Sequence, residues 1–344
     1  MSAPVCLSVM GAGLIGKRHI QHILARPEAT LASIIDPTPA ARDMAQTLGV
    51  AWFRYFQDIP ADRRPEGVVV STPNQMHVAN SLECIEAGVP VLVEKPLADD
   101  LAGAQMLVDA AARKGAPLLT GHHRRHNPII QRAKAEIDSG RLGRLISVHG
   151  MFWLIKPDDY FDLAWRREKG AGPLLLNVIH DVDLLRYLVG EVDAVQAAQS
   201  NRVRGYGIEE TAVIILHFAN GVLGTINVSD TVQAPWSWEF TAGENADYSH
   251  TEETCYQIGG VKGSLSIPQL DFWSHPSKPS WWAPIERERL SYTPEDPLGR
   301  QIANFCGVIR GKAQPVVSGR EGLATLKVID AIKRAAESEL RVPV

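Results

Sequence analysis

Cysteine is scarce in this chain, which has four in 344 residues: Cys6, Cys84, Cys255 and Cys306. They are scattered and none forms a CxxC pair, so the sequence offers neither a disulfide framework nor the usual zinc pattern. Thiols spaced in this way are typical of a reducing compartment. We therefore expect a cytoplasmic protein that binds no metal.

Long hydrophobic runs and a strong excess of one charge are also missing. No apolar stretch approaches the roughly 20 residues that a membrane span needs, and the first residues do not resemble a signal peptide. A formal net charge of −4 argues against a nucleic-acid-binding protein. With 45% hydrophobic and 22% charged residues, the composition predicts a globular protein with room for two domains.

A glycine-rich segment lies directly between a predicted strand, residues 5–10, and a predicted helix that runs to residue 25. In this context GxGxxG is typical of a dinucleotide-binding loop. Its glycines allow a tight turn, a close approach of the pyrophosphate, and close packing of helix on strand. A glycine-rich turn without a ligand is the alternative. The candidate cofactor-binding residues of this segment are Gly11, Gly13, Leu14, Ile15 and Gly16.

A carboxylate, Asp36, ends the second predicted strand, 20 residues beyond Gly16. An acidic residue at this position accepts hydrogen bonds from the adenosine ribose, and it would repel a 2′-phosphate. The sequence therefore favours NAD over NADP as the cofactor. Arg42, about one helical turn further on, is the residue that would change this preference.

The apolar strand predicted at 89–94 ends on Glu94, which is followed by Lys95 and Pro96. Ligands of open α/β sheets bind at the carboxyl ends of the strands, so we expect Lys95 at the edge of a cleft. Strands alternate with helices from residue 5 to residue 120, which predicts an α/β, doubly wound parallel sheet of the Rossmann type. We expect this NAD-binding domain to span residues 1–122.

Three motifs together resemble the glucose–fructose oxidoreductase / inositol dehydrogenase / MocA (Gfo/Idh/MocA) family. They are Gly-Ala-Gly-Leu-Ile-Gly at 11–16, Ser-Thr-Pro-Asn-Gln-Met-His at 71–77 and Val-Glu-Lys-Pro-Leu at 93–97. The resemblance implies that Lys95 is the catalytic lysine beside the cofactor and that Glu94 contacts the nicotinamide ribose. It also implies that four residues lie along the dinucleotide: Ser71, Thr72, Asn74 and His77. For His77, a solvent-facing position at a helix start remains the alternative.

The segment 122–126 contains three histidines and two arginines. His122 and His126 have i, i+4 spacing, but no nearby carboxylate or thiol completes a metal-binding set. The segment matches a family motif at the floor of the substrate cleft, which implies that Arg124 and His123 face the substrate. Because the planar guanidinium suits a carboxylate or paired hydroxyls, we expect a polar or anionic substrate. A basic turn between domains is the alternative.

A polar loop at 156–172 supplies two further candidates. It contains Tyr160, which we assign to substrate binding, and the pair Trp165-Arg166. In the family a Trp-Arg pair in this loop closes over the nicotinamide and phosphates, which implies that Arg166 binds the cofactor. An exposed arginine is the alternative.

The helix predicted at 174–188 carries Asn177 and His180 on one face. His180 matches a histidine of the family motif, but the usual aspartate position of that motif holds Leu176. Asn177 can form hydrogen bonds with a substrate hydroxyl but cannot take a proton. The resemblance therefore leaves Lys95 and His180 as the catalytic acid–base residues.

From residue 192 onward the pattern is rich in predicted strands, and Asn220-Gly221 is a hairpin signal. This predicts a second, α+β domain over residues 123–344, built on an open, mostly antiparallel sheet. In the family the far face of that sheet packs against another subunit. We therefore expect a homodimer or homotetramer formed through this sheet.

The sequence leads to an NAD-dependent oxidoreductase that transfers hydride between the nicotinamide and a secondary alcohol of a small molecule: a sugar, cyclitol or related cyclic diol. Two alternatives remain open. One is a dehydrogenase of a carboxylated substrate, such as a sugar acid or dihydrodiol carboxylate. The other is a non-catalytic, NAD-dependent sensor, which the absent aspartate permits.

Overall fold

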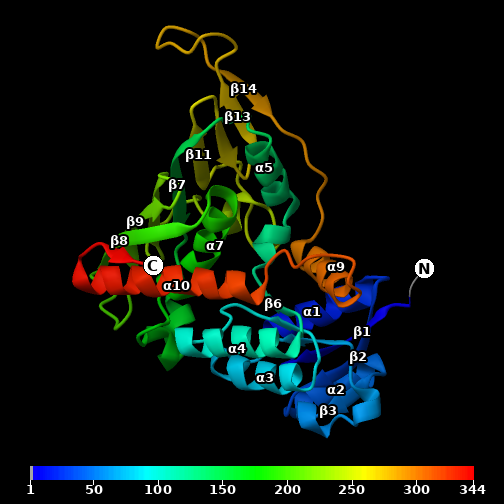
Figure 1. Ribbon diagram of the computed structural model, residues 1–344. Coiled ribbons are helices and arrows are strands. Elements are labelled where there is room, and N and C mark those ends of the chain that lie inside the picture. Colours follow the sequence, from blue (N-terminus) through cyan, green and yellow to red (C-terminus); the bar gives the residue numbers. More distant parts are fainter. Residues whose placement is uncertain (1–2) are drawn as a thin grey trace. The chain divides into compact units, whose positions relative to one another are not determined.

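The computed structural model describes residues 3–344 (Figure 1), and backbone contacts divide the chain into two compact units. The first comprises Met1–Asn127 and Glu295–Leu326, and the second comprises Pro128–Pro294 and Lys327–Val344. We expected a division at residue 122, with the whole remainder in the second domain. The observed division differs from this expectation because residues 295–326 belong to the first unit. There α9 (Pro297–Ile309) packs its Ile302 and Phe305 into the same core as α1 (Leu14–Ala25).

The first unit contains a six-stranded parallel sheet in the order β3-β2-β1-β4-β5-β6. Its strands are short and almost wholly buried, as expected where helices cover both faces. This confirms the predicted doubly wound sheet. The strands are β1 Val5–Met10, β2 Ala29–Ile35, β3 Ala51–Phe53, β4 Gly67–Val70, β5 Val91–Val93 and β6 Leu118–Thr120.

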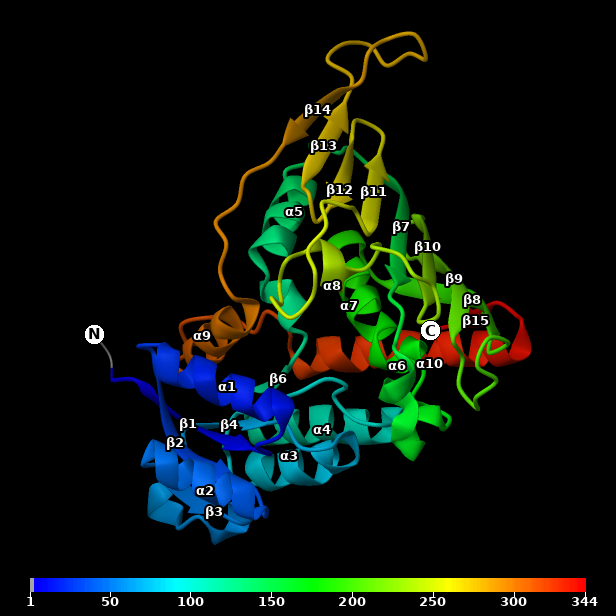
Figure 2. The same ribbon diagram turned by 180° about the vertical axis from the view of Figure 1, so that it is seen from behind.

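Helices cover the two faces of this sheet in pairs, with α1 and α9 on one face and α3 and α4 on the other (Figures 1 and 2). Side chains alternate accordingly, so that Val69 packs with α1 and α9 whereas Val68 and Val70 pack with α3 and α4. Besides α1 and α9, this unit contains the helices α2 Pro39–Leu48, α3 His77–Glu86 and α4 Leu101–Lys114. Its single turns are η1 Phe56–Asp58, η2 Ala61–Arg63, η3 Asn74–Met76 and η4 His123–His126.

The second unit is built on a nine-stranded sheet in the order β14-β13-β12-β11-β7-β10-β9-β8-β15. Among the described strand pairs of this second sheet, β10–β7 is the parallel one and the others are antiparallel, so the predicted open, mostly antiparallel sheet is confirmed. The strands are β7 Leu145–Trp153, β8 Val192–Ser200, β9 Thr211–Phe218, β10 Leu223–Ser229, β11 Tyr256–Gly260, β12 Ser264–Ile267, β13 Asp271–Ser274, β14 Glu286–Arg289 and β15 Val342–Pro343.

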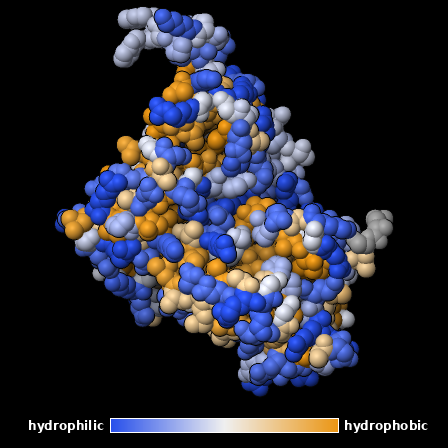
Figure 3. Space-filling view, viewed as in Figure 1, coloured by the Kyte–Doolittle hydropathy of each residue, from blue (hydrophilic) through white to orange (hydrophobic). Residues whose placement is uncertain are grey.

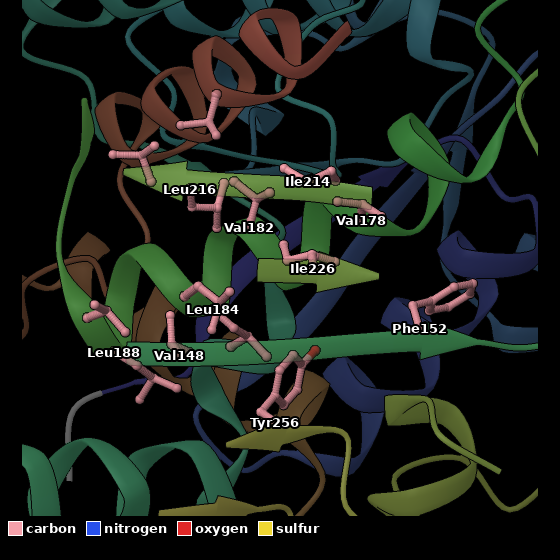
Figure 4. Packing of buried hydrophobic residues seen from close by; sticks show 14 of the residues in the cluster. Val148, Phe152, Val178, Val182, Leu184, Leu188, Ile214, Leu216, Ile226 and Tyr256 are labelled. Carbon is pink, nitrogen blue, oxygen red and sulfur yellow. The ribbon is translucent and has the colours of Figure 1, made fainter. Parts of the chain in front are cut away.

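One face of this sheet packs against helices to form the core of the second unit. Figure 4 shows side chains of β7, β9 and β10, such as Phe152 and Ile214, facing Val178, Val182 and other residues of α7. The helices of this unit are α5 Pro128–Asp138, α6 Pro173–Leu176, α7 Val178–Val189, α8 Trp238–Thr241, the turns η5 Asp158–Asp162 and η6 Ala164–Arg167, and the later part of α10 Gly319–Ser338.

Two local expectations in this unit were wrong. The strand-rich pattern predicted from residue 192 onward included residues 238–242, but Trp238–Thr241 form the short helix α8, because Ser237 caps it by accepting a hydrogen bond from the N–H of Phe240. The helix predicted at 174–188 is divided into α6 and α7 at Asn177, whose backbone has φ −114°. The division places Asn177 immediately before the first turn of α7.

The space-filling view in Figure 3 shows hydrophilic residues interspersed with hydrophobic ones over this face of the molecule. Within residues 3–344, none of the helices combines the length and the apolar character that crossing a membrane requires.

Candidate active site

The first unit contains a cavity of about 710 Å³ at the carboxyl ends of β1, β2 and β4. It is lined by residues that the sequence predicted for cofactor binding: Gly11, Gly13, Leu14, Ile15, Asp36, Ser71 and Thr72. Arg54, Tyr55 and Asn80 also line it and were not predicted. The cavity is large enough for a nucleotide, and its glycine wall is where a pyrophosphate would approach the backbone.

Close backbone packing explains two of the glycines. Gly11 has φ +90°, and a Cβ there would lie 2.7 Å from the Ser71 carbonyl oxygen. A Cβ on Gly16 would lie 1.9 Å from the Gly11 carbonyl oxygen, to which Ser71 Oγ donates a hydrogen bond of 2.8 Å. A Cβ on Gly13 would meet nothing within 4 Å, so that glycine leaves open space at the cavity. This open space fits a bound dinucleotide.

Asp36 is held rigidly at the cavity wall. One carboxylate oxygen accepts hydrogen bonds from the Thr38 N–H (2.8 Å) and hydroxyl (2.6 Å), and the other accepts from the Ala12 N–H (2.8 Å). Arg42 lies over the Trp52 ring, at 5.6 Å, while Arg54 lines the cavity. The carboxylate therefore favours a free ribose hydroxyl. Arg54 lines the cavity and Arg42 does not, so Arg54 is the arginine that could pair with a 2′-phosphate.

His77 is 1% exposed, so the alternative of a solvent-facing residue is wrong. Its Nδ1 lies 2.8 Å from the Pro96 carbonyl oxygen and its Nε2 lies 2.9 Å from that of Thr72. Burial lowers the pKa of His77, and hydrogen bonding to these two carbonyls opposes that shift. His77 thus ties the segment after β4 to the segment that carries Lys95. Asn74 lies just before this helix and is half-buried.

Glu94 forms a buried pair with His19, a residue that sequence reasoning missed. His19 Nε2 donates to Glu94 Oε1 at 2.7 Å, and the other carboxylate oxygen accepts from the Lys95 N–H at 3.2 Å. Burial alone would raise the pKa of Glu94. The hydrogen bond and the charges of His19, His123 and Lys95 outweigh burial and lower the pKa to about 2. Glu94 is therefore a carboxylate at neutral pH.

Replacing His19 with alanine should reduce the free energy of unfolding at pH 7 by about 3 kcal/mol, because it leaves a buried carboxylate without its partner. The folded-state pKa of Glu94, about 2, lies below the ordinary 4.5, so the ionised group stabilises the fold fully above pH 4.5. That contribution is lost as the pH falls through about 2. The difference between wild type and His19→Ala should therefore shrink on acidification.

Urea unfolding followed by circular dichroism at several pH values measures this difference. His22→Ala is the matched control, since His22 lies one turn further along α1 with a partly exposed side chain 3.4 Å from Asp296. It should cost no more than about 1 kcal/mol. Equal losses in the two variants would contradict the role given to His19.

The carboxyl end of β6 lies beside that of β5 and brings the basic segment close to Glu94. A Cβ on Gly121 would lie 3.0 Å from the Glu94 Cα, so only glycine permits this approach. His123 and Lys95 are half-buried, and both lower the pKa of Glu94. Lys95, Glu94 and His123 therefore belong to one site at this edge of the sheet.

The basic segment forms the turn η4, most of which is buried. Arg124 is 5% exposed and Arg125 is 3% exposed. Arg125 forms an ion pair of 2.9 Å with Glu321 on α10. No group of three histidine, cysteine or carboxylate residues suited to a metal occurs within residues 3–344.

In the second unit, the start of α7 presents Asn177 and His180. The His180 N–H donates to the Asn177 carbonyl oxygen at 3.0 Å, and His180 is 8% exposed. The neighbouring Asp181 is buried and accepts a hydrogen bond from the Tyr256 hydroxyl on β11. Sequence reasoning missed this partner, which is 75 residues away along the chain.

The loop 156–172 joins its two candidate residues. Arg166 donates to the Tyr160 carbonyl oxygen at 2.7 Å, and its guanidinium lies over the Tyr160 ring at 4.1 Å, so it is not simply an exposed arginine. The loop begins at Lys156, which is buried and forms an ion pair of 3.2 Å with Asp230. Burial lowers the pKa of Lys156 although Asp230 raises it. These contacts anchor the base of the loop.

The candidates are thus divided between the two units, and those of the second unit form two separate pairs, Asn177 with His180 and Tyr160 with Arg166. Lys95, Glu94 and His123 lie beside one another in the first unit, which also holds the dinucleotide cavity. The candidates of the first unit can hold a cofactor and move a proton at the Lys95 amine. Those of the second unit include an imidazole and an amide for hydrogen bonding to a hydroxyl.

Two family models match the chain. The model described as "Oxidoreductase family, NAD-binding Rossmann fold" matches residues 6–122, and the "GFO/IDH/MocA C-terminal domain" matches residues 130–266. A 1,5-anhydro-D-fructose reductase of Ensifer adhaerens is 29% identical over 287 residues, covering 81% of this chain and 80% of that protein. A myo-inositol 2-dehydrogenase of Thermotoga maritima is 25% identical over 350 residues, covering 98% and 97%.

A solved structure is also similar over its whole length. It is the WlbA dehydrogenase of Bordetella pertussis in complex with NADH and UDP-GlcNAcA, with a TM-score of 0.79 and 26% identity. The similarity covers 99% of each chain.

Proposed function

The chain belongs to the GFO/IDH/MocA family of NAD-dependent oxidoreductases that act on CH–OH groups, and from that premise we propose that its substrate is a secondary alcohol of a sugar, cyclitol or related cyclic diol. The relatives support this substrate class, since those reported above are named for an anhydrosugar and for an inositol. The site supports it through Glu94 and His123, the polar residues that share a site with Lys95.

The observation that carries the proposal is the position of Lys95 at the carboxyl end of β5, in contact through its N–H with a carboxylate held ionised by His19. NAD, when bound, supplies the hydride acceptor for oxidation of the alcohol. Lys95 would take or return the hydroxyl proton and stabilise the developing oxyanion. His180 is the second proposed acid–base residue, and Asn177 would orient a substrate hydroxyl.

Residues of the first unit would bind the successive parts of NAD. Gly11, Gly13 and the start of α1 would bind the pyrophosphate, and Asp36 the adenosine ribose. Glu94 would bind the nicotinamide ribose. Arg166 would also bind the cofactor, as the resemblance to the family implies.

The experiment that tests the proposal follows the absorbance of NADH while the protein is mixed with inositols, aldoses, sugar acids and carboxylated diols, with NAD and NADP in parallel. Turnover of a polyol with NAD is the expected result. NAD binding without turnover of any compound would contradict the proposed substrate class and favour the sensor.

A carboxylated substrate is the second candidate, and the buried arginines beside the site favour it. Arg124 and Arg125 directly follow His123 and are almost wholly buried, and Arg125 forms an ion pair with Glu321. Such a cationic wall suits an anion. The related WlbA structure was solved with UDP-GlcNAcA.

Competition by small carboxylates distinguishes this candidate. If the substrate carries a carboxylate, malonate and benzoate should inhibit turnover, and Arg124→Ala should weaken that inhibition by at least about tenfold. Arg320→Ala, which removes an exposed arginine of the same unit, should leave the inhibition unchanged. Equal inhibition of wild type and Arg124→Ala would exclude Arg124 as the carboxylate-binding residue.

We also propose that the protein forms a homodimer or homotetramer through the open face of the second sheet. Four apolar side chains on neighbouring strands of that face are exposed: Ile146, Val213, Ile215 and Leu223, at 42%, 46%, 38% and 55%. Exposed apolar patches on a sheet are typical of interfaces. Light scattering tests this proposal, and a monomer at micromolar concentration would contradict it.

A further inference from the structure

The second unit contains a cavity of about 420 Å³ that shares no lining residue with the dinucleotide cavity. Its walls come from the end of β8 at 199–201, the turn at 207–209, the segment 169–175 and the last turns of α10. Its volume lies in the range of about 300–1,000 Å³ that is usual for small-molecule sites. None of the candidate active-site residues lines it.

Glu209 places a carboxylate in this cavity. One carboxylate oxygen accepts a hydrogen bond of 2.9 Å from the Leu174 N–H at the start of α6. The carboxylate lies against Gly172, where a Cβ would be 2.1 Å from the same oxygen, so only glycine leaves room for it. Glu209 is half-buried, and burial raises its pKa. The acidic group is therefore built into the wall.

Lys333 places an amine in the same cavity. It is half-buried on α10, and burial lowers its pKa while Glu209, Asp330 and Glu337 oppose that shift. Within residues 3–344, no ion pair within 4.0 Å joins its amine to Glu209 or to another carboxylate. The two opposite charges therefore line one cavity at a distance from each other, both partly removed from water.

The rest of the lining adds a rim and an apolar floor. Lys169 and Glu337 are already paired with each other at 2.6 Å and are exposed, so they contribute little net charge. Leu174 and Ile208 are buried and apolar. A ligand with a single charge would leave either Glu209 or Lys333 without a counter-charge.

We propose that this cavity binds a small zwitterion, an amino carboxylate of amino-acid size, whose carboxylate pairs with Lys333 and whose ammonium group pairs with Glu209. The ligand's short apolar part would lie on Leu174 and Ile208. Both half-buried charges of the wall are then compensated at once. A ligand of this kind would also hold the segment from Lys169 to Leu175.

That segment follows Arg166 by only three residues. An occupied cavity would therefore tighten the loop to which the proposed function assigns cofactor binding. This consequence rests on the proposed function, whereas binding of the zwitterion does not. Zwitterion binding is separated from its effect on the loop by measuring it on the protein without NAD.

The test is isothermal titration calorimetry of the full-length protein with each of the common amino acids, and with acetate and methylammonium as the single-charge halves. At least one amino acid should bind, and each half should bind at least about tenfold more weakly. Lys333→Met and Glu209→Gln should each weaken the binding by about tenfold or more, with the fold checked by circular dichroism.

Lys327→Met is the matched control, because it removes an exposed lysine of the same helix outside the cavity. It should bind like wild type. The proposal is overturned if no amino acid binds, or if the amino acid that binds does so equally well to Lys333→Met. Failure here would leave NADH formation unaffected, so it is distinct from failure of the proposed dehydrogenase activity.

Discussion

Lys95→Met is expected to lower kcat about a thousandfold, since general acid–base catalysis by a positioned side chain contributes about 10²- to 10⁴-fold. Methionine has nearly the length of lysine and occupies the same half-buried site after β5, but it carries no proton and no charge. The loss corresponds to about 4 kcal/mol of transition-state stabilisation. It should appear in kcat, measured by NADH formation with the substrate that the panel identifies.

Three observations separate a chemical role of Lys95 from a structural one. NAD affinity of Lys95→Met, measured by calorimetry, should change by less than about tenfold, because Lys95 is not among the residues that line the dinucleotide cavity. Lys95→Arg should stay nearly as slow, since a guanidinium does not give up its proton near neutral pH. Lys114→Met, which removes an exposed lysine paired with Glu86, should keep wild-type turnover. Wild-type kcat in Lys95→Met would refute the assignment.

Gly16→Ala and Gly13→Ala should both weaken NAD binding by at least about a hundredfold, but for different reasons. A Cβ at Gly16 would lie 1.9 Å from the Gly11 carbonyl oxygen, so the loop or α1 must shift. We expect this variant to lose about 3 kcal/mol of stability and roughly 6–12 °C in Tm. A Cβ at Gly13 has open space around it, so Gly13→Ala should keep the wild-type Tm.

NAD affinity of Gly13→Ala should nevertheless fall by at least about a hundredfold, because the added methyl group takes the space through which a pyrophosphate approaches the backbone. Calorimetry with NAD and differential scanning calorimetry without it measure the two effects separately. Tight NAD binding by Gly13→Ala would show that the dinucleotide does not lie against this loop.

The strand, loop and helix at residues 5–25 were predictable because their signals are local. An apolar run, three spaced glycines and an amphipathic helix follow one another within a single supersecondary unit. The same holds for Asp36 and Glu94, which directly follow the apolar strands β2 and β5 as the first charged residues. The order β3-β2-β1-β4-β5-β6 follows from such repeated units and from the handedness of their crossovers.

His19 and His77 show where sequence reasoning ended. His19 is three residues after Gly16 and on the buried face of α1, a position where a polar residue calls for a partner. That partner, Glu94, is 75 residues away along the chain. His77 has the pattern of an exposed helix start, yet it is buried because two carbonyl oxygens from separate loops meet its ring.

The sequence by itself determined the first unit's strands, its dinucleotide loop and the family to which the chain belongs, because these depend on residues close together along the chain. Only the tertiary structure decided that α9 completes the first core, that the basic segment is buried beside Glu94, and that Glu209 and Lys333 share a cavity. Pairings of this kind depend on which distant segments pack together. Packing is governed by the shape and burial of whole elements, which no local pattern encodes.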